Sequence, residues 1–435
     1  MLLDKNIVLA AGLRLPQVKA GGAYMKEEAA HMGTAVTREL LARTELDPSI
    51  FDEVVCGSIG PPHDQANIAR VIALRAGIPR QIPAYTVARN CASGMQAVTS
   101  AATQIVAGQG ETYLAIGVEH MSGYPLLFNR KATSFFAKLA TARSTGAKLK
   151  AIASWRPAML APRISLLEGL VDPVTDMIMG STAELIARDF GITREECDLF
   201  AAESHNRAQV AREAGRLNDE IMPYLPLGAS SRAKALIADD GIRDGQSPEA
   251  LARLRPYFEK PDGIVTVGNA CGITDGAVAL VITTAERAGE LGLRPLARIR
   301  SFAYTGCDPK RMGLGPVSAV AKCLDAGRAT LNDVGIVELN EAFAAQVIGC
   351  RRAMASKSYC EEHLGRLSAL GDLDPKKLNP NGGAIAIGHP VGATAARLLL
   401  TTALQLESKD LELGLATLCI GGGQGGAVLL ERCSA

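Results

Sequence analysis

Hydrophobic positions along the chain follow two spacings. Short runs of β-branched and apolar residues are typical of strands, and longer stretches with apolar residues three and four apart are typical of helices. Strands are expected at 6–13, 51–59, 84–88, 113–118, 277–284, 297–304, 335–339, 413–418 and 427–431. Helices are expected at 25–46, 66–77, from Cys91 to about 108, 182–190, 194–215, 318–326 and from His389 to about 405. This alternation predicts an α/β protein with a largely parallel sheet covered on both faces.

The same order of parts occurs twice in the chain. Cys91 opens a helix of small residues that is followed by a strand and Ile116-Gly117. His389 opens a similar helix that is followed by a strand and Ile420-Gly421. Such an internal duplication predicts two similar α/β halves. If the halves pack face to face, the starts of both helices converge on one site.

The first half is interrupted by a segment of different composition, which we assign to roughly 122–272 as an insertion. Residues 121–167 contain eight basic residues and no acidic residue, with phenylalanines and the only tryptophan interleaved. A solvated helical face explains this pattern. A surface for phosphates, for an acidic partner or for an anionic membrane explains it equally well. The sequence does not separate these interpretations.

Composition limits the class of protein further. The chain has 435 residues, so two or three structural units are expected, and its net charge of +1 does not indicate nucleic-acid binding. Ten cysteines occur in no paired spacing, and no Cys/His cluster has the spacing of a zinc site. No apolar run of about 18 residues and no targeting segment is found. We therefore expect a cytoplasmic protein in a reducing compartment, with no metal.

Cys91 is the first candidate for chemistry. It lies at a predicted turn from strand to helix, where free N–H groups and the positive helix end favour a thiolate. The alternative is a cysteine that only packs, because the helix behind it has almost no polar face. A nucleophilic cysteine needs a base beside it. Of the six histidines, His389 is the leading candidate, because Gly388, Pro390 and Gly392 place it on a stiff turn of small residues.

Two further positions fit the same site. Cys419 precedes 421–426, a run that is all glycine except Gln424, so a substrate can approach the backbone and its free N–H groups there. A tight turn before an edge strand is the alternative. Asn340, at a predicted strand end, is a side-chain donor of the kind found in oxyanion sites, although an Asx turn also accounts for it.

Four motifs contain these residues: Asn90-Cys91-Ala92-Ser93-Gly94, Asn340-Glu341-Ala342-Phe343, Gly388-His389-Pro390-Val391-Gly392-Ala393 and Cys419-Ile420-Gly421-Gly422-Gly423-Gln424-Gly425. In this order they resemble the signature blocks of thiolases. The resemblance implies two βαβαβαββ halves packed as a five-layer αβαβα structure with an inserted loop domain. The implied division is 1–121 and 273–292 for the N-terminal half, 122–272 for the insertion, and 293–435 for the C-terminal half.

The resemblance also implies the chemistry and the roles of individual residues. Thiolases cleave 3-ketoacyl-CoA with CoA, or run the reverse condensation, so CoA and acyl-CoA are expected as substrates and no cofactor is expected to be tightly bound. Cys91 would be the acylated nucleophile, His389 its activator, and Asn340 the holder of a water at the enolate oxygen. Cys419 would be the second acid and base. The N–H groups of Cys91 and Gly421 would form an oxyanion hole, and Met179, Cys271 and Gly272 would contact the substrate.

Two positions depart from the usual thiolase pattern and indicate which branch of the family the chain resembles. Ile178 and Cys271 stand where many short-chain thiolases have histidine and serine. With the basic insertion, Ile178 resembles the β-subunit of the fatty-acid oxidation trifunctional complex, although that branch usually has histidine at Asn340. This implies β-oxidation, a homodimer or homotetramer, and contact with a hydratase/dehydrogenase α subunit or a membrane. A biosynthetic acetoacetyl-CoA thiolase is the alternative. Two further alternatives share the fold. A β-ketoacyl synthase would use two histidines for catalysis. A non-enzymatic lipid carrier would be expected to lack one of the reactive residues, all of which are present here.

Overall fold

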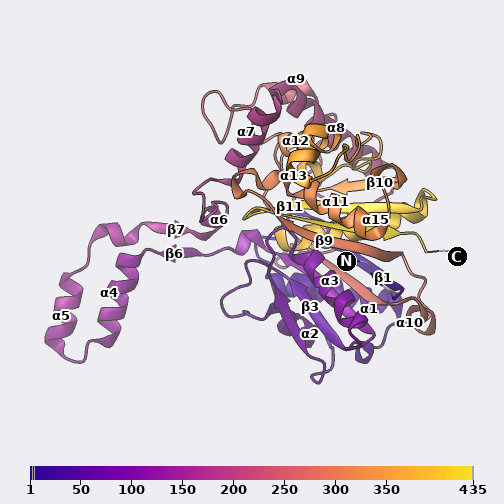
Figure 1. The fold of residues 1–435 in the computed structure, drawn as a ribbon. Coiled ribbons are helices and arrows are strands. Elements are labelled where there is room, and N and C mark those ends of the chain that lie inside the picture. Colours follow the sequence, from indigo (N-terminus) through magenta and orange to yellow (C-terminus); the bar gives the residue numbers. More distant parts are fainter. Residues whose placement is uncertain (2, 4, 434–435) are drawn as a thin grey trace.

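One mixed sheet runs through the molecule in the computed structural model, which describes residues 1, 3 and 5–433 (Figure 1). Its strands follow the order β10 (Ile336–Leu339), β11 (Leu413–Ile420), β12 (Gln424–Glu431), β9 (Ala297–Gly306), β1 (Ile7–Arg14), β8 (Thr274–Thr284), β5 (Thr112–Glu119), β3 (Glu53–Gly57) and β4 (Ala84–Val87). The two-residue strand β2 (Val18–Lys19) pairs with β8 beside this path.

The sheet is not largely parallel, so the sequence-based expectation of strand direction was wrong. Only β3–β4, β3–β5 and β10–β11 pair in parallel, and the five other neighbouring pairs along this path are antiparallel. β8 returns to the sheet only after the long excursion that follows β5, and β12 follows β11 through a tight turn. Hydrophobic spacing identifies such strands but contains no information about their direction.

The two similar halves predicted from the repeated Cys91 and His389 units are confirmed. Starting from the centre, the first half runs β1, β8, β5, β3, β4 and the second runs β9, β12, β11, β10. In both, two antiparallel junctions are followed by a parallel one. The halves join where β1 pairs with β9 at Val8 and Leu9.

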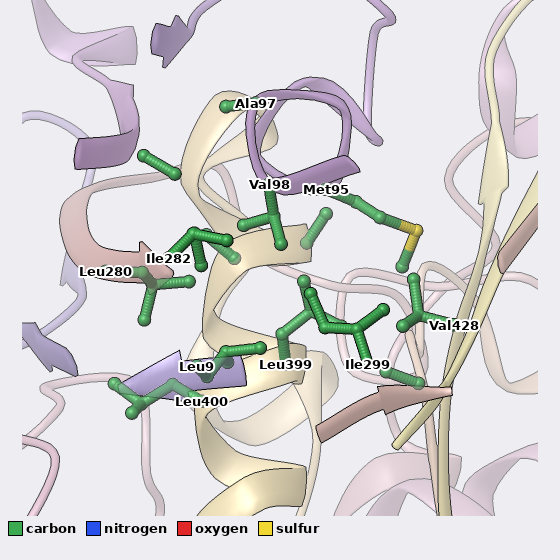
Figure 2. Packing of buried hydrophobic residues seen from close by; sticks show 14 of the residues in the cluster. Leu9, Met95, Ala97, Val98, Leu280, Ile282, Ile299, Leu399, Leu400 and Val428 are labelled. Carbon is green, nitrogen blue, oxygen red and sulfur yellow. The ribbon is translucent and has the colours of Figure 1, made fainter. Parts of the chain in front are cut away.

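Helices lie outside each half of the sheet and between the halves, which gives five layers in total. α1 (Ala29–Thr44) and α2 (Ile68–Ala76) cover one outer face, and α11 (Gly315–Gly327) and α12 (Ala344–Ala355) cover the other. α3 (Ser93–Val106) and α15 (Val391–Ser408) lie between the halves, where α15 contacts both β5 and β11. Figure 2 shows the apolar side chains that meet around these two helices, among them Leu9, Met95, Val98, Leu280, Ile299, Leu399 and Val428.

The first turns of α3 and α15 approach closely because glycine occupies both. A Cβ added at Gly94 would lie 2.8 Å from the carbonyl oxygen of Gly392. A Cβ added at Gly392 would lie 2.4 Å from the carbonyl oxygen of Val118. Real Cβ atoms do not tolerate such distances from backbone oxygens. The residues that open the two helices are therefore held together by backbone-to-backbone packing.

The chain between β5 and β8 forms an arm and a helical layer. The arm projects from the body in Figure 1 and consists of β6 (Leu126–Phe128), α4 (Arg130–Thr141), α5 (Thr145–Ala153) and β7 (Pro162–Ile164). The helical layer contains α6 (Ser165–Gly169), α7 (Met179–Phe190), α8 (Arg194–Glu213) and α9 (Pro248–Ala252). The remaining helices are α10 (Ala285–Glu290), α13 (Lys357–Leu364) and α14 (Ala384–Ile387). In the described part of the chain, no helix has the length and apolar character needed to cross a membrane.

Candidate active site

A cavity of about 250 Å³ opens beside the first turns of α3 and α15. It is lined by Ile59, Asn90, Cys91, Met121, Tyr124, Leu166, Gly169–Val174, Met179, Val391, Gly421 and Gly422. Both halves and the insertion contribute to this wall. A larger cavity of about 420 Å³ lies between α8 and α12 and contains none of the candidate residues.

Cys91 lies in the turn between β4 and α3, just before the helix N-cap at Ala92. Its side chain is partly exposed to the cavity. Hydrogen bonds from the N–H groups of Gly421 and Cys91 lower the pKa of the thiol, but burial raises it more strongly, and the pKa lies above its ordinary value. The N–H groups therefore favour the thiolate, as the sequence predicted, but the larger effect of burial outweighs them. The thiol holds its proton in the free protein and needs a base to remove it.

His389 lies in the turn before α15, and one of its ring nitrogens carries no proton and can act as a base. Its Nδ1 lies 2.7 Å from the hydroxyl oxygen of Thr394, and that hydroxyl donates its own proton to the carbonyl oxygen of Pro390 at 2.9 Å. Nδ1 must then carry the ring proton, which leaves a lone pair on Nε2. Burial, with a smaller effect of the Arg397 charge, lowers the pKa of His389 to about 4. The ring is therefore neutral near pH 7.

Asn340 follows β10 and is completely buried. Its Nδ2 lies 3.5 Å from Nε2 of His389, and its backbone N–H donates to the carbonyl oxygen of Thr417 at 3.0 Å. Its Oδ1 has no hydrogen-bond partner among the residues that the structure describes. A buried amide oxygen without a protein partner is a position at which a water molecule is retained.

Cys419 lies near the end of β11, fully buried among Met179, Ala342 and Phe343. Burial and the neighbouring thiols of Cys91, Cys350 and Cys271 raise its pKa well above the ordinary value. It is a neutral thiol that can donate a proton.

The glycine turn after Cys419 connects the two halves. The carbonyl oxygen of Gly421 accepts from Asn90 Nδ2 at 2.7 Å, and this bond joins the turn to the Cys91 loop. Gly422 and Gly423 have φ angles of +87° and +80°, which other residues rarely adopt. This conformation leaves the N–H of Gly421 directed at Cys91.

The three predicted substrate contacts differ in position. Met179, at the start of α7, lines the cavity. Burial, with a smaller effect of the nearby Cys91 thiol, raises the pKa of Cys271 to about 12. Gly272 lies next to it, outside the residues that line the cavity.

Sequence reasoning missed most of the cavity wall. Tyr124, Leu166, Leu170 and Val174 come from the insertion, and no local spacing marks them. It also missed Glu119, a buried acid at the end of β5 that accepts a hydrogen bond from Tyr124. A carboxylate directly after the apolar run 113–118 was a signal that could have identified it.

No group of three or more histidine, cysteine or acidic side chains could hold a metal ion within residues 1, 3 and 5–433. Of the proposed catalytic side chains, Cys91 lines the cavity, whereas His389, Asn340 and Cys419 are buried outside its lining. The chemistry available around Cys91 is that of the nearby thiols of Cys271 and Cys419, a neutral imidazole, an amide and backbone N–H groups. This set supports nucleophilic acyl transfer with proton transfer between neutral partners.

Comparison with known proteins gives matches over nearly the whole chain. The family models "Thiolase, N-terminal domain" and "Thiolase, C-terminal domain" match residues 7–286 and 293–432. The "Acetyl-CoA acetyltransferase" of Allochromatium vinosum is 39% identical over 99% of this chain and 100% of its own. The "3-ketoacyl-CoA thiolase" of Pectobacterium carotovorum is 38% identical, over 98% and 96%. A human mitochondrial 3-ketoacyl-CoA thiolase in complex with CoA superposes with a TM-score of 0.85 at 31% identity, covering 100% of both chains.

The tautomer and charge of His389 can be tested by ¹⁵N NMR of labelled histidine, with the resonance assigned by His389→Asn. We expect the ring to carry its proton on Nδ1 and to stay neutral down to about pH 5, because its pKa is lowered. In Thr394→Val, Nδ1–H loses its buried acceptor, which costs about 1–3 kcal/mol and moves population to the other tautomer.

Thr402→Val is the matched control, since Thr402 is also buried on α15 and donates to a carbonyl one turn back. It should leave the His389 resonances unchanged. A wild-type ring protonated on Nε2, or one that titrates at the ordinary histidine pKa, would contradict this assignment.

Proposed function

Because the chain belongs to the thiolase family and is an acyltransferase, we propose that it catalyses the CoA-dependent cleavage of 3-ketoacyl-CoA. The products are acetyl-CoA and an acyl-CoA shortened by two carbons, and an acyl-cysteine on Cys91 is the intermediate. One observation carries the proposal. A protonated thiol and an imidazole with an unprotonated Nε2 are placed at the adjoining first turns of α3 and α15, beside a second thiol.

In the first half-reaction, Cys91 attacks the 3-keto carbonyl carbon and transfers its proton to Nε2 of His389. The bond between the second and third carbons then breaks, which leaves the acyl group on sulfur and the enolate of acetyl-CoA. A water held by Asn340, together with the imidazolium of His389, stabilises the enolate oxygen. The buried thiol of Cys419 protonates the enolate carbon and becomes a thiolate.

In the second half-reaction, a new CoA donates its thiol proton to the Cys419 thiolate and attacks the acyl carbon. The negative oxygen of the tetrahedral intermediate is held by the N–H groups of Cys91 and Gly421, which already point at the Cys91 sulfur. Collapse transfers the acyl group to CoA, and Cys91 recovers its proton from His389. One thioester replaces another, so the same site runs in either direction.

CoA is proposed as a substrate, and no tightly bound cofactor is required. The CoA complex of the human relative supports this assignment. We propose that the insertion 122–272 receives CoA between the half formed by 1–121 with 273–292 and the half formed by 293–435. Met179, which lines the cavity, would contact the thioester end of the substrate, with Cys271 and Gly272 beside it.

For the physiological role we propose fatty-acid β-oxidation by a homodimer or homotetramer in the cytoplasm. Relatives named 3-ketoacyl-CoA thiolase support this role, and relatives named acetyl-CoA acetyltransferase support the biosynthetic alternative. Many apolar side chains face the cavity from the insertion, among them Leu166, Leu170 and Val174. This lining favours an acyl chain longer than acetoacetyl.

The test is CoA-dependent cleavage of 3-ketoacyl-CoA substrates of increasing chain length, followed by loss of the enolate absorbance. We expect the highest kcat/KM at long chains, and Cys91→Ala should lower the rate by at least about 10⁴-fold because it removes the nucleophile. Activity confined to acetoacetyl-CoA would favour the biosynthetic role. Absence of cleavage by the folded protein, or decarboxylation of a malonyl thioester, would contradict the proposal.

The arm 126–164 supports a second proposal, that the protein binds an anionic partner. Its surface exposes large apolar side chains, with Phe128 at 61% and Leu160 at 68%. A groove of about 360 Å³ is lined by Arg130, Lys131, Lys138 and neighbours. Basic and apolar groups on one projecting element fit an acidic face of a hydratase/dehydrogenase subunit or an anionic membrane.

Neutralising Arg130, Lys131, Lys138 and Arg143 to glutamine should abolish binding while cleavage of acetoacetyl-CoA continues. Flotation with vesicles of anionic or neutral lipid, and pull-down with a purified hydratase/dehydrogenase subunit, distinguish the two partners. The matched control neutralises four exposed basic residues elsewhere, Arg232, Lys234, Arg253 and Arg255. If wild type and the arm variant behave alike in both assays, the arm has no such role.

A further inference from the structure

Glu119, the last residue of β5, is a completely buried carboxylate at the edge of the active site. Each of its two carboxylate oxygens accepts two hydrogen bonds. Oε1 accepts from the N–H of Gly60 and from the hydroxyl of Tyr124, each at 3.0 Å. Oε2 accepts from the N–H of Ile59 at 3.0 Å and from the N–H of Gly392 at 3.1 Å. All four partners are neutral groups.

These donors belong to separate segments that each form part of the cavity wall. Ile59 follows β3, Tyr124 comes from the start of the insertion, and Val391, next to Gly392, begins α15. Gly392 also lies three residues after His389. One carboxylate therefore joins the segment that contains the proposed base to the loop after β3 and to the start of the insertion.

The surroundings of the carboxylate favour its ionised form near pH 7. Burial raises the pKa of Glu119 to about 6, and the hydrogen bonds from three backbone N–H groups and the Tyr124 hydroxyl, which are stronger to an ionised acceptor, limit this rise. A negative charge at the first turn of α15 also interacts favourably with the helix dipole. The packing is tight, since a Cβ on Gly392 would lie 2.7 Å from Oε2 and a Cβ on Gly60 would lie 2.2 Å from the Tyr124 hydroxyl.

We infer that Glu119 is a positioning residue for the acyl-transfer reaction. It fixes the positions of His389 and of the cavity wall relative to Cys91. It does so through its hydrogen bonds to Gly392, Ile59, Gly60 and Tyr124. The inference rests on the proposed function. Glu119 does not touch the reacting atoms. It acts because the first turn of α15 fixes the direction of the His389 ring.

Glu119→Gln tests this role. The amide oxygen replaces only one carboxylate oxygen, so the NH₂ group faces either the N–H of Gly60 or the N–H groups of Ile59 and Gly392, and the loop after β3 or the first turn of α15 must move. We expect kcat for acetoacetyl-CoA cleavage to fall roughly 10- to 100-fold with KM changed less than about threefold, because misplacement by about 1 Å affects the reaction more than binding. The ¹⁵N resonance of His389 Nε2 should shift as well.

Glu27→Gln is the matched control. Glu27 is also buried and accepts from a tyrosine hydroxyl, that of Tyr224 at 2.9 Å, and from the N–H of Leu227 at 2.6 Å, but it does not line the cavity. It should change thermal stability without changing kcat or the His389 resonance. If Glu119→Gln fails to fold, Glu119→Asp, which keeps the charge on a shorter side chain, should give a smaller fall in kcat, by roughly 5- to 20-fold.

An unchanged kcat and an unchanged His389 resonance in either folded Glu119 variant would overturn the inference, as would an equal effect of Glu27→Gln. If the wild-type protein shows no turnover, the proposed function fails. The His389 resonance alone then decides whether Glu119 positions the ring.

Discussion

The structure depends on the close approach of two helix N-termini, those of α3 and α15. Glycine at positions 94 and 392 lets backbone meet backbone, with no room for a single extra carbon atom. Each half of the duplicated fold supplies one of these helices, so the contact brings Cys91 of one half beside the His389 turn of the other. The glycine turn after Cys419 and the buried Glu119 carboxylate then join further segments across the same junction.

Burial determines the charge state of the site. Removing the groups from water raises the pKa of Cys91 and Cys419 and lowers the pKa of His389, so all three are neutral at rest. The proposed reaction therefore starts by moving a proton from a thiol to an imidazole, and charge develops only where an amide, a water or backbone N–H groups receive it. Such a reaction depends strongly on the positions of its groups.

Much of the site could be predicted from sequence because chemistry and duplication left local signals. The repeated units predicted that the helices opened by Cys91 and His389 meet, and their first turns do adjoin. The glycine run marked the turn beside Cys419. Three features could not be predicted, and each depends on the tertiary structure. The direction of β8 follows from the return of the chain after the insertion, the thiol pKa depends on how far the fold removes Cys91 from water, and the four bonds of Glu119 join segments distant in sequence.

The central claim is that Cys91, and neither of the thiols near it, receives the acyl group. The most direct measurement is acid quenching after mixing with acetyl-CoA, followed by digestion and mass spectrometry of the peptides that contain Cys91, Cys271 and Cys419. The account predicts an acetyl group on Cys91 that free CoA removes and that is absent in Cys91→Ala. Acetylation of Cys271 or Cys419 in the wild-type protein, or retention of the label in Cys91→Ala, would contradict it.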